Sequence, residues 1–271
     1  MKTNGFILRE SRGIRYYSCS AFVKIPGLYH GFSTRPGGAP GFAGPELNLS
    51  YTSWDTAERV DENRRRFICA LDAGGSQLLT LRQVHSNRVH IVEQVPGQWS
   101  RPEGDALATR LPGLALAVKV ADCLPVLIAD PENRAVAAVH SGWRGTLSRV
   151  LLQTILEMRR AFQSNPSDLL VATGPGIRSC CMEVGTEVAE LFEKEYANSG
   201  TVRPGTRAGK HVLDLCRALE IQLNIAGVPA ENCFDLGACT RCRPDEFFSY
   251  RAEGAASGRL MAVIGLNSVI R

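Results

Sequence analysis

Two histidines and one cysteine stand at the ends of apolar segments, where their side chains can meet around a metal ion. His140 ends one apolar run directly before a glycine turn, His85 follows Gln83 and Val84, and Cys123 lies in a polar break between two other apolar runs. Two imidazoles and a thiolate suit zinc, and three protein ligands leave a fourth position for a water that zinc acidifies. Spacing alone leaves a second reading open, in which Cys123 is a buried packing residue and the histidines are structural.

The elements that must position these residues are predicted from hydrophobic patterning. Three apolar segments are typical of buried strands: residues 114–120, 124–129 and 135–139. If the first and the third are neighbouring strands, Cys123 and His140 could share one end of a single sheet. Further strands are predicted over residues 169–172 and 260–266, and helices over residues 56–71, 147–162, 186–197 and 213–226.

This mixture of strands and helices predicts an α/β or α+β layered domain. No convincing linker interrupts the chain, so we predict a single domain over residues 1–271. Repeated glycines and prolines between residues 33 and 56 predict a long loop, and loops of that length in compact domains tend to be functional.

Composition argues against several classes of protein. Lys and Arg number 31 against 27 Asp and Glu, and the net charge of +4 falls short of the concentrated positive surface of a nucleic-acid binder. The first ten residues lack the apolar core of a signal peptide, and no apolar stretch is long enough to span a membrane. We therefore expect a cytoplasmic protein whose nine cysteines are reduced.

The cysteines include one adjacent pair, Cys180 and Cys181, and one CxxC motif formed by Cys239 and Cys242. A single CxxC is either half of a structural zinc site or a redox pair. Because the sequence holds no second CxxC, we do not expect a second metal site. We expect Cys180 and Cys181 to be packing residues in a tight turn.

Motifs along nearly the whole chain resemble those of the YfiH family, also called the multicopper polyphenol oxidase or laccase-type family. Four of them are HGFSTRPGG at 30–38, QVH at 83–85, ADCLP at 121–125 and HSGWRG at 140–145. The other matches are residues 47–49, 63–64, 104–107, 174–177, 183–185, 239–240 and 247–251. Each motif is short, but their number and order are specific.

The resemblance implies a zinc site of His85, Cys123 and His140 in a layered α/β (α+β) sandwich of mixed β-sheets flanked by helices. It also implies purine nucleoside chemistry: phosphorolysis of adenosine, inosine and methylthioadenosine, and deamination of adenosine. The partners would then be a small purine nucleoside and phosphate, and a homodimer would fit the family. Met182 departs from the family pattern, which usually has an aromatic residue at this position.

Deamination also needs a group that moves a proton beside the attacking water. Asp105 and Asp122 are the candidates by motif, and the sequence does not choose between them. Either carboxylate could instead orient a histidine ligand, since metal-bound histidines usually donate their second N–H group to such a partner.

Phosphorolysis needs groups that hold phosphate and ribose. Arginine suits phosphate because its planar fork donates two parallel hydrogen bonds. The candidates are Arg35 in the glycine-rich loop, Arg64 on the following helix and Arg144 at a predicted helix N-terminus. Asn48 could bind the ribose hydroxyls. The alternative is that the arginines are solvated surface residues and that Asn48 bonds its own backbone.

Two other enzymatic functions would use the same residues. Copper bound by His85, Cys123 and His140 would make a laccase-like polyphenol oxidase, because two histidines and a cysteine also suit copper. A metal-free cysteine hydrolase would use Cys123 as nucleophile and His140 as base. A binding module without catalysis is a third reading, and it would show an exposed apolar face without a pocket.

Overall fold

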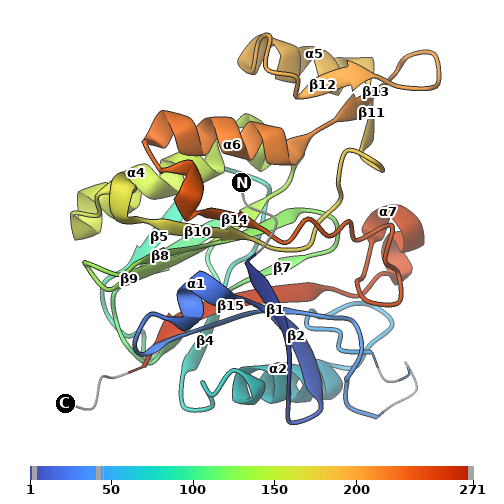
Figure 1. Ribbon diagram of the computed structural model, residues 1–271. Coiled ribbons are helices and arrows are strands. Elements are labelled where there is room, and N and C mark those ends of the chain that lie inside the picture. Colours follow the sequence, from blue (N-terminus) through green and yellow to red (C-terminus); the bar gives the residue numbers. More distant parts are fainter. Residues whose placement is uncertain (2–4, 41–43, 45, 268–271) are drawn as a thin grey trace.

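Two six-stranded β-sheets stacked face to face form the centre of the molecule, as Figure 1 shows for the computed structural model, which describes residues 1, 5–40, 44 and 46–267. The first sheet has the strand order β1 (Phe6–Ser11), β2 (Ile14–Cys19), β3 (Leu28–Ser33), β15 (Leu260–Leu266), β7 (Leu114–Val120) and β4 (Gln77–Thr80). The second sheet has the order β14 (Cys233–Asp235), β10 (Leu170–Thr173), β8 (Leu124–Asp130), β9 (Ala135–Ser141), β6 (Ala106–Thr109) and β5 (Val89–Val92). Parallel pairing of β4 with β7, β5 with β6 and β10 with β14 makes both sheets mixed.

Helices cover both outer faces of the stacked sheets. The helices are α1 (Ser20–Val23), α2 (Ala57–Ala70), α3 (Trp143–Leu147), α4 (Val150–Phe162), α5 (Thr186–Glu195), α6 (Leu215–Ala226) and α7 (Tyr250–Glu253), with 3-10 turns at Pro166–Asp168, Ala230–Asn232 and Gly254–Ala256. Helices α4 and α6 pack on the second sheet, and α2 packs on the first. Among the described residues, no helix has both the length and the apolar character needed to cross a membrane.

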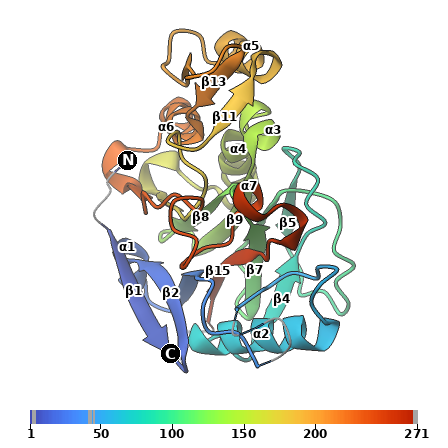
Figure 2. The same cartoon turned by 90° about the vertical axis from the view of Figure 1, so that its right-hand side faces the viewer.

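A small third sheet stands at the end of the molecule opposite α2, together with α5 (Figure 2). Its strands are β11 (Glu183–Gly185), β13 (Lys210–Leu213) and β12 (Val202–Pro204). Its first strand, β11, follows β10 in the chain after the loop of residues 174–182.

Alternation of side chains along the central strands builds the apolar layers between these elements. On β8, Leu127 lies in the layer between the two sheets, whereas Val126 and Ile128 lie in the layer beneath α4 and α6. On β7, Leu116 faces the second sheet and Ala117 lies in the layer beneath α2. Each central strand is therefore buried on both faces, which explains its continuous apolar sequence.

The predicted layered fold is confirmed. Two of its helices begin or end at residues that commonly cap helices. Helix α2 begins after Thr56, whose side chain accepts a hydrogen bond from the N–H of Arg59, and α6 ends before Gly227 at φ 86°. The helix predicted over residues 147–162 is α4, which begins only at Val150 because Arg149 before it adopts a left-handed φ of 58°. The short helix α3 lies before it, over residues that the sequence predicted as a turn. Part of the predicted glycine-rich loop, residues 41–43 and 45, lies outside the described residues.

The strands at 114–120 and 135–139 do not pair with each other, so the condition for a shared sheet end is not met. Strand β7 belongs to the first sheet and β9 to the second, and the chain passes between the sheets after β7. Strand β8 then pairs with β9, so that Pro125 lies opposite His140. The sequence could not decide the pairing, because a strand buried on both faces has the same apolar pattern in either sheet.

The layer between the sheets is expected to carry much of the stability. Leu127 is fully buried there, so Leu127→Ala should lower the free energy of unfolding by about 3 kcal/mol. Leu156 on α4 is 46% exposed, so Leu156→Ala should change the free energy of unfolding by less than about 1 kcal/mol. Urea denaturation followed by circular dichroism measures both, and equal losses would contradict this assignment of the core.

Candidate functional site

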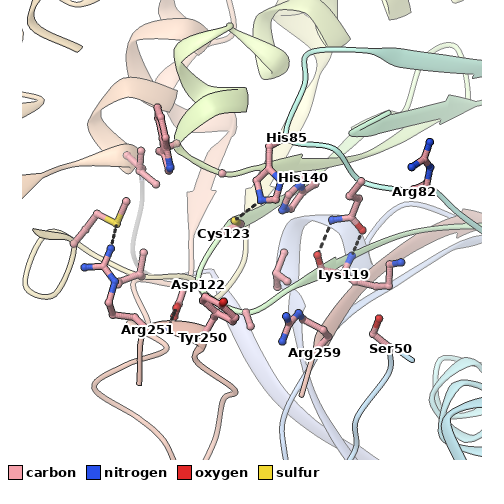
Figure 3. A pocket seen from close by; sticks show the side chains of 18 residues that line it. Ser50, Arg82, His85, Lys119, Asp122, Cys123, His140, Tyr250, Arg251 and Arg259 are labelled. Atoms are coloured by element: carbon pink, nitrogen blue, oxygen red, sulfur yellow. Dashed lines mark hydrogen bonds between the residues drawn. The ribbon is translucent and has the colours of Figure 1, made fainter. Parts of the chain in front are cut away.

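The side chains of His85, Cys123 and His140 meet at one point beside the β8–β9 pair (Figure 3). Their donor atoms all lie within 4.8 Å of one another. The Cys123 Sγ lies 3.9 Å from His85 Nε2. The centroids of the His85 and His140 rings are 5.0 Å apart, and the two ring planes make an angle of 72°. The structure thus brings together the three residues that the sequence predicted as metal ligands.

Local backbone features allow this close approach. His85 and Asp122 adopt left-handed conformations, with φ of 59° and 88°, which are uncommon for residues other than glycine and often occur at functional sites. A Cβ atom on Gly142 would lie 2.8 Å from the Sγ of Cys123 and 3.0 Å from the His85 ring. Any side chain at position 142 would therefore displace the donors.

The buried carboxylate of Asp105 holds the two histidines in place. Its Oδ1 accepts hydrogen bonds from His140 Nδ1 at 2.8 Å and from the backbone N–H of His85 at 3.0 Å. Its Oδ2 accepts from the backbone N–H and the hydroxyl of Ser86, at 2.6 Å and 2.7 Å. Burial opposes ionisation of Asp105, but the hydrogen bonds from His140 and Ser86 lower its pKa to about 2. Asp105 is therefore an ionised group that orients the His140 ring.

The sulfur of Cys123 is a thiolate near neutral pH. Burial would raise the pKa of Cys123, but His140 and His85 lower it to about 6. Burial would likewise lower the pKa of His140, whereas Cys123 and Asp105 raise it to about 9. A thiolate is the form in which cysteine binds metals or attacks an electrophile, so this charge pair suits either chemistry.

Asp122 lies beside Cys123 on the wall of a cleft, and three donors fix its carboxylate. Its Oδ1 accepts from the hydroxyls of Thr240 and Ser249, both at 2.7 Å. Its Oδ2 accepts from the backbone N–H of Arg251 at 2.6 Å. Because Asp122 borders the cleft and Asp105 is fully buried beneath it, Asp122 is the better placed of the two carboxylates for proton transfer.

The cleft over these residues has a volume of about 520 Å³. The three donor residues line it together with cationic and aromatic side chains, among them Arg82, Lys119, Tyr250, Arg251 and Arg259. Figure 3 shows Lys119 and Arg82 to one side of the donors and Arg251 to the other. Burial, with the charges of Arg64, Arg101 and Arg259, lowers the pKa of Lys119 to about 8. The cleft thus combines soft metal-type donors with a cationic wall.

The residues predicted to bind phosphate and ribose lie outside the cleft lining. Arg35 is held between two glutamates, Arg64 donates to a backbone carbonyl at 2.9 Å, and Arg144 stacks on the preceding tryptophan. Asn48 is fully buried, and its Oδ1 accepts from the backbone N–H of Arg259. These contacts give Arg35 and Asn48 supporting positions behind the cleft wall.

Sequence reasoning gave no site role to the cations that do line the cleft, Arg82, Lys119, Arg251 and Arg259. Lys119 carried a usable signal, because it is the one charged residue within the otherwise apolar segment 114–120. Arg82 and Arg259 had no such signal, since each is one arginine among many polar residues near a strand end.

Comparison with known proteins matches nearly the whole chain to one family. The family model described as "Multi-copper polyphenol oxidoreductase laccase" matches residues 29–267. The chain is 40% identical over 240 residues to a purine nucleoside phosphorylase of Deinococcus radiodurans, with 88% of each chain covered. It is 36% identical over 251 residues to adenosine deaminase RL5 of an unknown prokaryotic organism, with 88% of this chain and 94% of the relative covered.

The fold is also shared with a solved structure. The crystal structure of the Bacillus licheniformis hypothetical protein YfiH matches with a TM-score of 0.87 at 27% identity, over 97% of this chain and 100% of that chain. Fold, sequence and family model agree over nearly the same length. The chain therefore belongs to the YfiH family, also called the laccase-type family.

Proposed function

We propose that this protein is a zinc-dependent purine nucleoside phosphorylase that acts on adenosine, inosine and methylthioadenosine and that also deaminates adenosine. The observation that carries the proposal is one cleft with both a zinc-type donor set and a cationic wall suited to phosphate. The relatives named as a purine nucleoside phosphorylase and an adenosine deaminase support the same pair of reactions.

His85, Cys123 and His140 fit zinc by type and by spacing. Zinc binds imidazole nitrogen at about 2.0 Å and thiolate at about 2.3 Å, which sets such donors about 3.5 Å apart on a tetrahedron. The 3.9 Å between Cys123 Sγ and His85 Nε2 is close to that value. Bound there, zinc would supply a Lewis acid that activates water or polarises the substrate.

The cationic wall would hold the attacking phosphate. Lys119 and Arg259 line the cleft, and the guanidinium of Arg259 lies over the Tyr250 ring with its centre 5.6 Å from the ring centroid. These two cations would offer donors to an anion, and charge-assisted hydrogen bonds of this kind are stronger than neutral ones. Arg82, on the same wall, is paired with Glu103. A phosphate oxygen held by Lys119 and Arg259 can attack the ribose carbon while the bond to the purine breaks.

Asp122 would move the proton that each reaction needs. In deamination the carboxylate would take the proton that the attacking water loses and pass it to the departing amine. In phosphorolysis it would take a proton from the attacking hydrogen phosphate and pass it to a ring nitrogen of the departing purine. The carboxylate of Asp122 borders the cleft in an orientation fixed by its three donors. Tyr250, on the same wall, offers an aromatic face on which a purine can stack.

A metal-free cysteine hydrolase is the second candidate function. It is favoured by the charge pair in which the pKa of Cys123 is about 6 and that of His140 is about 9. A thiolate beside an imidazolium is the resting form of many cysteine nucleophiles. Copper oxidase chemistry is a third candidate, because the same donors suit copper and the family model is named for it.

Removal of the metal separates these candidates. We expect chelation to abolish phosphate-dependent cleavage of adenosine and inosine, and added zinc to restore it, because the Lewis acid is lost and regained. Cys123→Ala should be inactive with an unchanged circular dichroism spectrum, whereas Cys69→Ala, a matched control on α2, should stay active. Turnover unaffected by chelation would favour the cysteine hydrolase, and phenol oxidation that follows copper content would favour the oxidase.

Phosphate binding should depend on the charge of Lys119. Since the pKa of Lys119 is lowered to about 8, the side chain is cationic below that pH and loses its charge as the pH rises through it. The KM for phosphate should therefore rise above about pH 8. Lys119→Arg should remove this pH dependence, and Lys119→Met should raise the KM about 10-fold or more at pH 7. An identical pH profile for wild type and Lys119→Arg would contradict the assignment.

Neutralising Asp105 should lower zinc affinity, whereas neutralising Asp122 should lower kcat. Asp105→Asn should weaken zinc binding by about 10–100-fold, with activity recovered in excess zinc, because it orients a ligand. Asp122→Asn should keep its zinc and lose about 10²–10⁴-fold in kcat, because it transfers a proton. Zinc titration and steady-state kinetics measure both, and metal loss in Asp122→Asn with kcat preserved would reverse the roles.

A further inference from the structure

Four cysteines that the proposed function does not use gather in a second cluster, which we call the four-cysteine cluster. It consists of Cys180, Cys181, Cys239 and Cys242, whose Sγ atoms all lie within 4.8 Å of one another. The first pair lies in the loop after β10 and the second pair in the loop after β14. Because Cys180 is exposed and its sulfur lies 3.6 Å from that of Cys242, the expectation that it is a packing residue is wrong.

The spacing of the sulfurs fits a single tetrahedral cation. Zinc binds thiolate sulfur at about 2.3 Å, which sets neighbouring sulfurs about 3.8 Å apart. The Cys242 Sγ lies 3.6 Å from that of Cys180 and 3.4 Å from that of Cys181, and no pair exceeds 4.8 Å. All nine cysteines are free thiols, so these four are available as ligands. A set of four soft thiolates selects zinc-like cations.

Backbone hydrogen bonds hold the two loops that present these thiols. The carbonyl of Arg178 accepts from the N–H groups of Cys181 and Met182 at 2.8 Å and 2.9 Å, which turns the first loop. The N–H of Thr240 donates to the carbonyl of Gly176 at 3.2 Å, which ties the second loop to the first. The sulfurs are therefore brought together by paired backbone segments that are more than fifty residues apart.

Two thiols of the cluster are open to solvent. Cys180 and Cys242 are exposed, so a cation can reach the cluster from outside. Cys181 is half-buried and Cys239 is buried, so the cluster extends from the surface into the molecule.

We propose that the four-cysteine cluster binds one thiophilic divalent cation, zinc, in a closed structural site. Four protein ligands leave no open position, so the ion stabilises the fold instead of acting on substrate. Met182, which follows the first pair, lines the cleft, and Thr240, which lies within the second, donates to Asp122. The ion would thereby hold both loops that flank the cleft.

Metal content tests this site without reference to activity. The double substitution Cys180→Ser with Cys242→Ser should remove about one equivalent of zinc, and Cys69→Ser, the control, should remove none. Repeating the double substitution on a His85→Ala background should remove the zinc that remains there. Equal zinc in the double variant and wild type would overturn the proposal. A failure of the proposed catalytic site alone would change only the zinc that depends on His85.

Thiol reactivity of the wild-type protein gives a second test that needs no variant. Alkylation with N-ethylmaleimide, mapped by mass spectrometry, should spare Cys180 and Cys242 in zinc-loaded protein and modify both after chelation. Cys69 should react equally in the two states. Equal modification of Cys180 and Cys242 with and without zinc would overturn the proposal. So would a disulfide between Cys242 and Cys180 or Cys181 in freshly purified protein.

Discussion

The buried carboxylate of Asp105 is the interaction on which the rest of the candidate site depends. It accepts hydrogen bonds from the loop that carries His85 and from the ring of His140 on β9. A fully buried, ionised group persists only when such donors surround it. The charge of Asp105 therefore fixes the positions of both His85 and His140. The cations of the cleft wall can then bind the substrate.

The strands of the fold could be predicted from the sequence, but their arrangement in two sheets could not. The run over residues 114–120 is apolar because β7 is buried on both faces. For the same reason its sequence does not reveal which sheet it joins. The break between α3 and α4 was equally hidden, since Arg149 adopts its left-handed conformation through tertiary context and not through local propensity.

The candidate site was predictable where it uses rare residue types and unpredictable where it uses common ones. With five histidines in the chain, His85 and His140 were possible candidates, and the resemblance to the YfiH family selected them together with Cys123. The 31 lysines and arginines gave no comparable signal. Whether an arginine faces a cleft depends on which carboxylates neutralise it, as the two glutamates around Arg35 illustrate. The four-cysteine cluster was hidden for a related reason, because an adjacent cysteine pair is not half of a recognisable zinc motif.

The donors to Asp122 also set an order of events during synthesis of the chain. Thr240, Ser249 and Arg251 follow Asp122 by 118, 127 and 129 residues. A chain growing on the ribosome therefore exposes its histidines and Cys123 long before it can fix the neighbouring carboxylate. Contacts of such large sequence separation form late in folding, so the pocket wall is completed only when the C-terminal segment docks. A product truncated before Thr240 would carry His85, Cys123 and His140 but would lack the groups that fix Asp122 in the pocket wall.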